Sequence, residues 1–142
     1  MTDKPGLDAI PEIVDLSDIA AATGTAHGLL RQTAWKFVVI KRGRHMHLVL
    51  GPVSLFRYHA NLVDGFCHRY EIPASKARGT QRVEIYDRSV RVLGGGQISV
   101  NPESKSVRFH GLSTAYGPYD RDTISSILKR GSIFPGHTVL VD

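Results

Sequence analysis

The sequence predicts one α+β domain, built on a mixed β-sheet of about six strands with two main helices. Short runs of β-branched and aromatic residues, the pattern typical of strands, outnumber the segments with helical spacing. The two clear helical patterns are separated by several strand-like segments, which is typical of α+β proteins. The length of 142 residues suits a single domain with one sizeable core, and no internal repeat is visible.

Composition limits the function classes. Contents of 42% hydrophobic and 22% charged residues are those of an ordinary globular protein. A formal net charge of +5 favours acidic or phosphorylated partners, and the scattered basic residues favour a phosphate-facing surface over a nucleic-acid-binding tail. The only cysteine, Cys67, excludes an internal disulfide and suits a reducing compartment. Because no apolar run reaches membrane length and no leader pattern opens the chain, we expect a soluble, cytoplasmic protein without a membrane partner. We also expect a monomer.

Residues 1–34 are expected to form an arm and loop packed on the domain, which then spans residues 35–142. The arm mixes short apolar pairs with acids and a proline, with one turn of helix at 17–22 and a loop at 23–27. The first strand is predicted at 35–40. Its Lys36 would cost burial energy unless the ammonium group reaches solvent, as on an edge strand, or meets an anion.

The next strand is predicted at 45–50 and is expected to end at Gly51 and Pro52. His45 and His47 would share one face of it, a geometry that could hold a metal. However, zinc and iron sites need three or four ligands, and no third ligand with suitable spacing is nearby. We therefore expect no metal here and a solvated basic face instead.

The segment RYHANLVDGFCHRY, residues 57–70, has apolar residues at helical spacing and predicts an amphipathic helix. His59 falls where this helix begins, and the positive end of the helix dipole disfavours imidazolium there. The free backbone N–H groups of the first turn, including that of Ala60, can bind an anion. The segment could thus supply a base and a phosphate cradle, or His59 could be a surface histidine at a helix end.

After this helix, residues 73–80 are expected to form a surface loop, and residues 83–86 and 90–93 one bent strand or a tight hairpin. Gly94, Gly95 and Gly96 follow, and then a strand at 97–100. Three glycines in a strand interior require a reason, such as a bulge or the close approach of another backbone or a ligand. They are not a Walker loop, because no Gly-Lys-Ser/Thr follows. A polar turn at 101–105 and a strand at 106–111 complete a hairpin.

The stretch LSTAYGP, residues 112–118, joins that strand to a helix predicted at 120–130, which should end at Gly131. Small residues in such a loop leave N–H groups accessible, and Ser113 adds a hydroxyl. These groups could hold phosphoryl oxygens, or the stretch could be a plain connection. A last strand is predicted at 138–141.

Several stretches together resemble the janus family, to which the small eukaryotic phosphohistidine phosphatases belong. The glycine triplet followed by the S-x-A-Y-G-P loop is the most specific feature, and the similarity runs from about residue 35 to the end. The stretches are LGGGQIS (93–99), STAYGP (113–118), YHAN (58–61), KFVVI (36–40) and the short IPE (10–12).

The resemblance implies a metal-independent hydrolase, without a cofactor, that removes phosphate from phosphohistidine and also phospholysine in proteins. It implies His59 as the catalytic residue, Lys36 as the substrate-binding lysine, and Ser113, Thr114 and Ala115 as the phosphate-binding loop. The residue types and their positions already indicate the same sites: a possible base at a helix start, a lysine within an apolar strand, and a loop with accessible N–H groups. Its partners would be phosphohistidine-containing proteins, with no nucleic acid.

Two positions depart from the family pattern. The phosphatases carry an arginine directly after the three glycines, whereas this chain has Gln97 after Gly96; they carry an acid directly before the Tyr-His pair, whereas this chain has Arg57. Arg57 could supply the missing cation, or both changes could alter substrate choice. Two alternatives to catalysis remain: a phosphate- or phosphoprotein-binding module that uses the same pocket, and a nucleic-acid-binding protein suggested by the charge.

Overall fold

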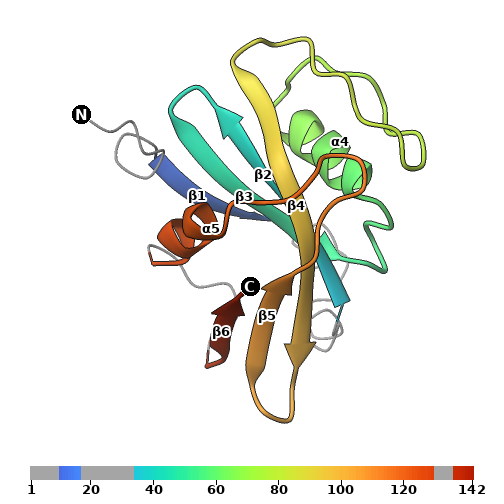
Figure 1. Cartoon of the computed structure of the whole chain (residues 1–142). Coiled ribbons are helices and arrows are strands. Elements are labelled where there is room, and N and C mark those ends of the chain that lie inside the picture. Colours follow the sequence, from blue (N-terminus) through green and yellow to red (C-terminus); the bar gives the residue numbers. More distant parts are fainter. Residues whose placement is uncertain (1–9, 17–33, 130–135) are drawn as a thin grey trace.

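The structure is a computed structural model that describes residues 10–16, 34–129 and 136–142. Over these residues it is a single α+β domain with one six-stranded sheet and two helices (Figure 1), which confirms the predicted fold class. In chain order the elements are β1 (Ile10–Asp15), β2 (Ala34–Arg42), β3 (His45–Pro52), α4 (His59–Arg69), β4 (Val90–Asn101), β5 (Ser106–His110), α5 (Arg121–Leu128) and β6 (Thr138–Val141).

The sheet is mixed and has the strand order β1-β3-β2-β4-β5-β6. The four inner strands pair antiparallel with one another. The two outer pairs, β1 with β3 and β5 with β6, are parallel. The strands nearest to the two ends of the chain therefore form the two edges of the sheet.

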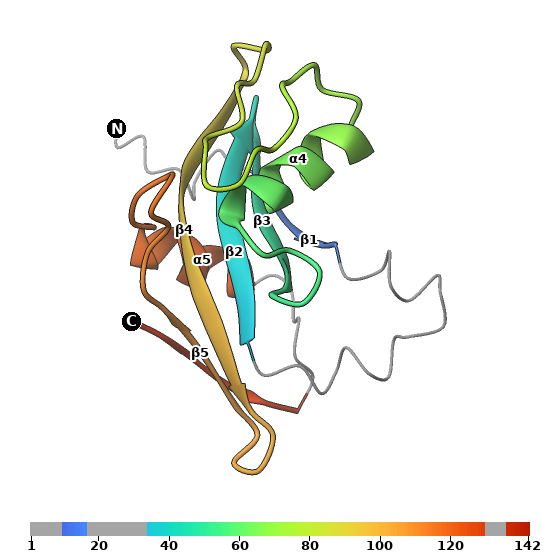
Figure 2. The ribbon, with the colours of Figure 1, turned by 90° about the vertical axis from the view of Figure 1, so that its right-hand side faces the viewer.

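One helix covers each face of the sheet (Figure 2): α4 lies on one side and α5 on the other. Side chains alternate along a strand, so Val38 and Ile40 of β2 pack beneath α4 while Phe37 and Val39 point toward α5. Within the part of the chain that the structure describes, no helix is both long and apolar enough to cross a membrane.

Part of the predicted N-terminal arm is a strand of the sheet. Residues 10–15 pair in parallel with 45–50, and Val14 and Leu16 are buried in the core beneath α4. The predicted helical turn at 17–22 and the loop at 23–27 lie outside the described residues, as does Gly131. The helix predicted at 120–130 is shorter, because α5 ends at Leu128 with Lys129 as its C-cap.

The prediction that Gly51 and Pro52 end their strand is wrong, because β3 continues through both and pairs them with Lys36 and Trp35. A Cβ atom at position 51 would lie 2.3 Å from the ring of Phe56. The glycine therefore makes room for an aromatic side chain packed on the strand.

The glycine triplet lies inside one continuous strand, β4, which begins at Val90. The prediction that 90–93 is extended is therefore correct, whereas its pairing with 83–86 as one bent strand or a tight hairpin is wrong. Residues 83–86 have no regular structure apart from a single bridge between Ile85 and Ala74. At Gly94, where φ is +132°, an added Cβ atom would lie 1.9 Å from the carbonyl oxygen of Pro118. The corresponding distances to backbone carbonyl oxygens are 2.4 Å at Gly95 and 2.6 Å at Gly96. The predicted close approach of another backbone is thus correct at each of the three glycines, and the pairing with β2 also shifts register beside them.

Candidate active site

A pocket of about 100 Å³ opens at the N-terminal end of α4. It brings together segments that are far apart in the sequence: β2, the start of α4, the 73–86 connection, β4 and the 113–117 loop. Most of the site residues predicted from the sequence converge here. The residues that line the pocket are Lys36, Tyr58, His59, Ala60, Thr80, Gln97, Thr114 and Ala115.

His59 is the first residue of α4 and only 7% exposed. Its Nε2 atom lies 2.8 Å from the carbonyl oxygen of Gly96. Because a carbonyl oxygen only accepts, Nε2 carries the proton and donates it, which leaves Nδ1 as the ring nitrogen with a free lone pair. Burial lowers the pKa of His59, and the charge of Lys36 lowers it further, while the bond to Gly96 opposes both effects. The imidazole is therefore held neutral with one nitrogen able to accept a proton.

The start of α4 is fixed by its flanking residues. The backbone N–H of Tyr58 donates to Asn61 Oδ1 at 2.9 Å, and the Tyr58 carbonyl accepts the Asn61 N–H at 3.0 Å. The first N–H groups of a helix have no acceptor within it, and the helix dipole makes them attractive to anions. Ala60 lies in this first turn and lines the pocket, so its N–H is a suitable anion donor.

Lys36 reaches the pocket from an inner strand. Since β2 lies between β3 and β4, the alternative of an edge-strand lysine is wrong. Lys36 is on the same face as Val38 and Ile40, the face that α4 covers. Its cross-strand partners are Gln97 on one side and Gly51, which has no side chain, on the other. Burial lowers the pKa of Lys36, as expected for an ammonium group partly withdrawn from water.

Gly95 allows the His59 ring to lie against the sheet. A Cβ atom at this position would be 3.3 Å from His59 Cδ2 and 2.4 Å from the carbonyl oxygen of Phe37. A side chain here would push both β2 and the imidazole away. The glycine triplet thus supplies the surface on which the histidine rests and, through Gly96, its hydrogen-bond acceptor.

In the view of Figure 1 the loop that follows β5 passes across β4 to the far edge of that strand. Its ends close on each other: Ser113 N–H donates to the Gly117 carbonyl at 3.2 Å, and Gly117 N–H to the Ser113 carbonyl at 2.8 Å. The N–H of Gly95 also donates to the Gly117 carbonyl, which ties the loop to β4. Thr114 and Ala115, between these ends, line the pocket.

Ser113 itself is buried and does not line the pocket. Its hydroxyl accepts the Tyr116 N–H at 3.1 Å, so it shapes the loop from within. Gly96 contributes its carbonyl to His59 and also does not line the pocket.

The two positions that depart from the family pattern differ in their placement. Gln97 lines the pocket, and its Nε2 donates to the Leu112 carbonyl at 3.1 Å. Arg57 is exposed and outside the pocket lining; its guanidinium lies 5.4 Å from the centre of the Tyr58 ring. The structure therefore places Arg57 against a residue that lines the pocket.

Sequence reasoning missed two lining residues, Tyr58 and Thr80. Tyr58 precedes His59 in the chain, and its position directly before a helix-initiating histidine was an available signal. Thr80 comes from a segment with the composition of a linker, and nothing in the local sequence indicates that it reaches the pocket.

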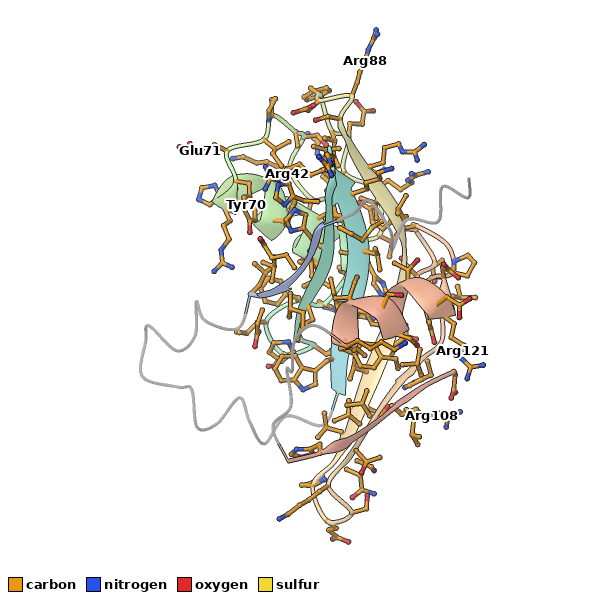
Figure 3. All side chains as sticks on the ribbon, turned by 90° about the vertical axis from the view of Figure 1, so that its left-hand side faces the viewer. Arg42, Tyr70, Glu71, Arg88, Arg108 and Arg121 are labelled. Carbon is orange, nitrogen blue, oxygen red and sulfur yellow. The ribbon has the colours of Figure 1, made fainter. Side chains whose placement is uncertain are left out.

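The predicted solvated basic face around His45 and His47 is wrong for His47, which is completely buried. Its Nδ1 lies 3.2 Å from Glu12 Oε1, and the same oxygen accepts the Tyr70 hydroxyl at 2.7 Å. Arg42 lies over the Tyr70 ring, and Figure 3 shows these two side chains together. Tertiary packing of α4 and β1 on the sheet covers this face. Across residues 10–16, 34–129 and 136–142, no three His, Cys, Asp or Glu side chains are grouped to hold a metal.

Comparison with known proteins gives one finding. The model of the Janus/Ocnus family (Ocnus) matches residues 27–138, most of the chain. No curated protein matches it.

Proposed function

The chain belongs to the Janus/Ocnus family, which includes phosphohistidine phosphatases, and on this premise we propose that it hydrolyses phosphohistidine in proteins without a metal. The observation that carries the proposal is the 2.8 Å contact between His59 Nε2 and the Gly96 carbonyl. This contact assigns the proton to Nε2. It leaves Nδ1 free to accept a proton or to attack phosphorus, beside a pocket lined by Lys36 and the first turn of α4.

In this proposal the phosphoryl group is held by charge and by backbone donors. Lys36 offsets part of its negative charge as a point cation. The N–H groups of Ala60, Thr114 and Ala115 donate to the non-bridging oxygens, as preorganised donors do for charge that develops in a transition state. Ser113 acts indirectly, since its hydroxyl accepts the Tyr116 N–H.

The chemical step needs little covalent assistance. Once the far ring nitrogen of phosphohistidine is protonated, neutral imidazole becomes the leaving group and the P–N bond breaks readily. In one version, Nδ1 of His59 takes a proton from water while the water oxygen attacks phosphorus, and inorganic phosphate is released. In the other, Nδ1 attacks phosphorus directly and water then hydrolyses the phosphoenzyme. Phospholysine, also a phosphoramidate, is a second substrate for the same site.

The test is hydrolysis of a phosphohistidine-containing protein by wild type and His59→Ala, with EDTA present. Loss of a working base or nucleophile should lower the rate by about a hundredfold or more. His68→Ala is the matched control, because His68 is an exposed histidine near the other end of the same helix. Its rate should equal that of wild type.

A His59→Ala rate within about threefold of wild type would remove His59 from the mechanism. Loss of wild-type activity on EDTA treatment, with recovery on adding zinc or magnesium, would overturn metal independence. An acid-quenched, labelled phosphoenzyme on His59 would select the nucleophilic version.

A phosphoprotein-binding module is the second candidate, and Gln97 is the observation that favours it. Where the family phosphatases carry an arginine, this chain has a neutral side chain engaged with the Leu112 carbonyl. A binder would take up a phosphohistidine analogue in the same pocket, with His59→Ala affecting affinity, but would show no turnover by wild type.

A further inference from the structure

The loop formed by residues 74–83 is part of the pocket wall. Its Thr80 lines the pocket together with His59, and Arg78 and Gln81 form a bridge that closes the tip on which Thr80 lies. At its base, Ala74 bridges to Ile85. A ligand whose phosphoryl group occupies the pocket must therefore pass next to this loop.

Two hydrogen bonds fix the position of the 74–83 loop relative to the pocket. Ala77 N–H donates to Asp64 Oδ2 of α4 at 3.2 Å, and Val83 N–H donates to the Tyr116 hydroxyl at 2.8 Å. Asp64 belongs to the helix that begins with His59, and Tyr116 to the loop that carries Thr114 and Ala115. The 74–83 loop is thus attached to both elements that would hold the phosphoryl group.

The outer surface of the loop is positively charged. Lys76, Arg78 and Arg82 are all exposed, and the one acidic residue between Ala74 and Ile85 is Glu84, next to the base of the loop. Arg82 is held over the Tyr116 ring, with its guanidinium 5.3 Å from the ring centre. Exposed cations of one sign beside a pocket attract acidic groups and raise their local concentration.

We propose that the 74–83 loop determines substrate specificity by binding acidic residues that flank the phosphorylated histidine of a protein substrate. This inference rests on the proposed function. A pocket of about 100 Å³ is too small for a length of peptide, so the polypeptide on either side of the phosphoryl group must lie on the rim. Lys76 and Arg78 are the cations nearest in sequence to Thr80 on its N-terminal side.

The test is equilibrium binding of two fluorescent peptides that carry a non-hydrolysable phosphohistidine analogue, one with acidic and one with neutral flanks. The full chain is compared with the double variant Lys76→Glu/Arg78→Glu. The matched control is Arg44→Glu/Arg88→Glu, which makes the same change in net charge. Both control residues are exposed. They lie beyond the end of β2 that is far from Lys36, where Gly43 N–H bonds to the Ser89 carbonyl. Arg88 projects from that end of the molecule (Figure 3).

We expect the wild type to bind the acidic peptide more tightly than the neutral one. Lys76→Glu/Arg78→Glu should weaken acidic-peptide binding by about tenfold and leave neutral-peptide binding within about twofold, and the preference should fall as salt is raised. The control should behave as wild type for both peptides.

Four outcomes would overturn the inference: no binding of the acidic peptide by wild type, no preference between peptides, equal losses in the loop variant and the control, or displacement of the acidic peptide by RNA at equal charge concentration. A small phosphoramidate, which has no flanking residues, separates this inference from the proposed function. If wild type and both variants hydrolyse it equally, catalysis stands whatever the peptides show. If none does, catalysis fails while the peptide comparison still decides the role of the loop.

Discussion

Lys36 and Gln97 are direct cross-strand partners in β2 and β4, and both line the pocket that holds His59. Directly paired residues present their side chains on the same face of a sheet, so the two lie next to each other. Among the lining residues found in the described parts of the chain, Lys36 is the only lysine or arginine. If a phosphoryl group binds in this pocket as proposed, its negative charge is offset mainly by the ammonium group of Lys36. Substitutions of Lys36 and Gln97 should therefore have large effects on phosphate binding.

Removing that ammonium group should weaken substrate binding and transition-state stabilisation together. We expect Lys36→Ala to cost about 1.5–3 kcal/mol in kcat/KM for phosphohistidine, the range for a charge-assisted hydrogen bond. Lys41→Ala is a suitable control, because Lys41 is on the same strand and its partners Met46 and Arg91 are far from the pocket. Equal kinetics for both variants would show that Lys36 does not contact the phosphoryl group.

The pair Arg57 and Gln97 tests whether one departure from the family compensates for the other. If Arg57 supplies the missing cation, Arg57→Ala should weaken phosphate binding and Gln97→Arg in that background should partly restore it. Because Arg57 lies against Tyr58, its effect should be lost in Tyr58→Ala, which removes the ring that orients it. Inorganic-phosphate affinities around the double-mutant cycle measure the coupling. Purely additive effects would mean that the two positions act independently.

The pH profile of hydrolysis should report the environment of His59. Burial lowers the pKa of this imidazole below the ordinary histidine value of 6.5, so the neutral ring persists on acidification. The acid limb of kcat/KM should consequently have its midpoint below pH 6.5. Lys36→Ala removes a cation that lowers the same pKa, and should move the midpoint upward. A midpoint above 6.5 in wild type would contradict the neutral-base assignment.

Buried His47 should make folding stability sensitive to acid. Burial lowers its pKa to about 4 from 6.5, so between these values the unfolded chain binds a proton that the folded protein excludes. Stability is then complete above pH 6.5 and is lost as the pH falls, by up to about 3 kcal/mol. Urea unfolding at several pH values should show this slope in wild type and a smaller one in His47→Leu. An unchanged slope in the variant would assign the acid sensitivity elsewhere.

Gly95 should tolerate no side chain. Since a Cβ atom would lie 2.4 Å from the Phe37 carbonyl and 3.3 Å from His59, Gly95→Ala should destabilise the fold by about 2–3 kcal/mol and lower turnover. At Gly43 a Cβ atom would meet open space, and only the left-handed φ of +58° is unfavourable. Gly43→Ala should therefore cost about 1 kcal/mol and leave turnover unchanged. Similar turnover in Gly95→Ala and Gly43→Ala would show that Gly95 does not affect the position of His59 in the site.

The position of His59 could be predicted because it depends on local pattern: apolar spacing fixes α4, and the histidine falls at its first residue. The glycine triplet also indicated a close approach of another backbone as one of its possible reasons. The continuity of β4 through the triplet could not be predicted, since glycine has low strand propensity and the strand is held there by pairing with Phe37, Val38 and Val39 of β2, which are distant in sequence. The burial of His47 depends on packing partners distant in sequence, Glu12 and Tyr70.

The position of the outer strands determines which truncated forms of the protein should stay monomeric. Residues 27–138, which match the family model, exclude β1 entirely and retain only Thr138 of β6. A protein trimmed to that range would present unpaired backbone donors and acceptors along both β3 and β5. Such open borders recruit further chains by strand addition. The trimmed form should therefore self-associate, and a well-behaved form should extend from before Ile10 through Asp142, whose backbone N–H bonds to the Phe109 carbonyl.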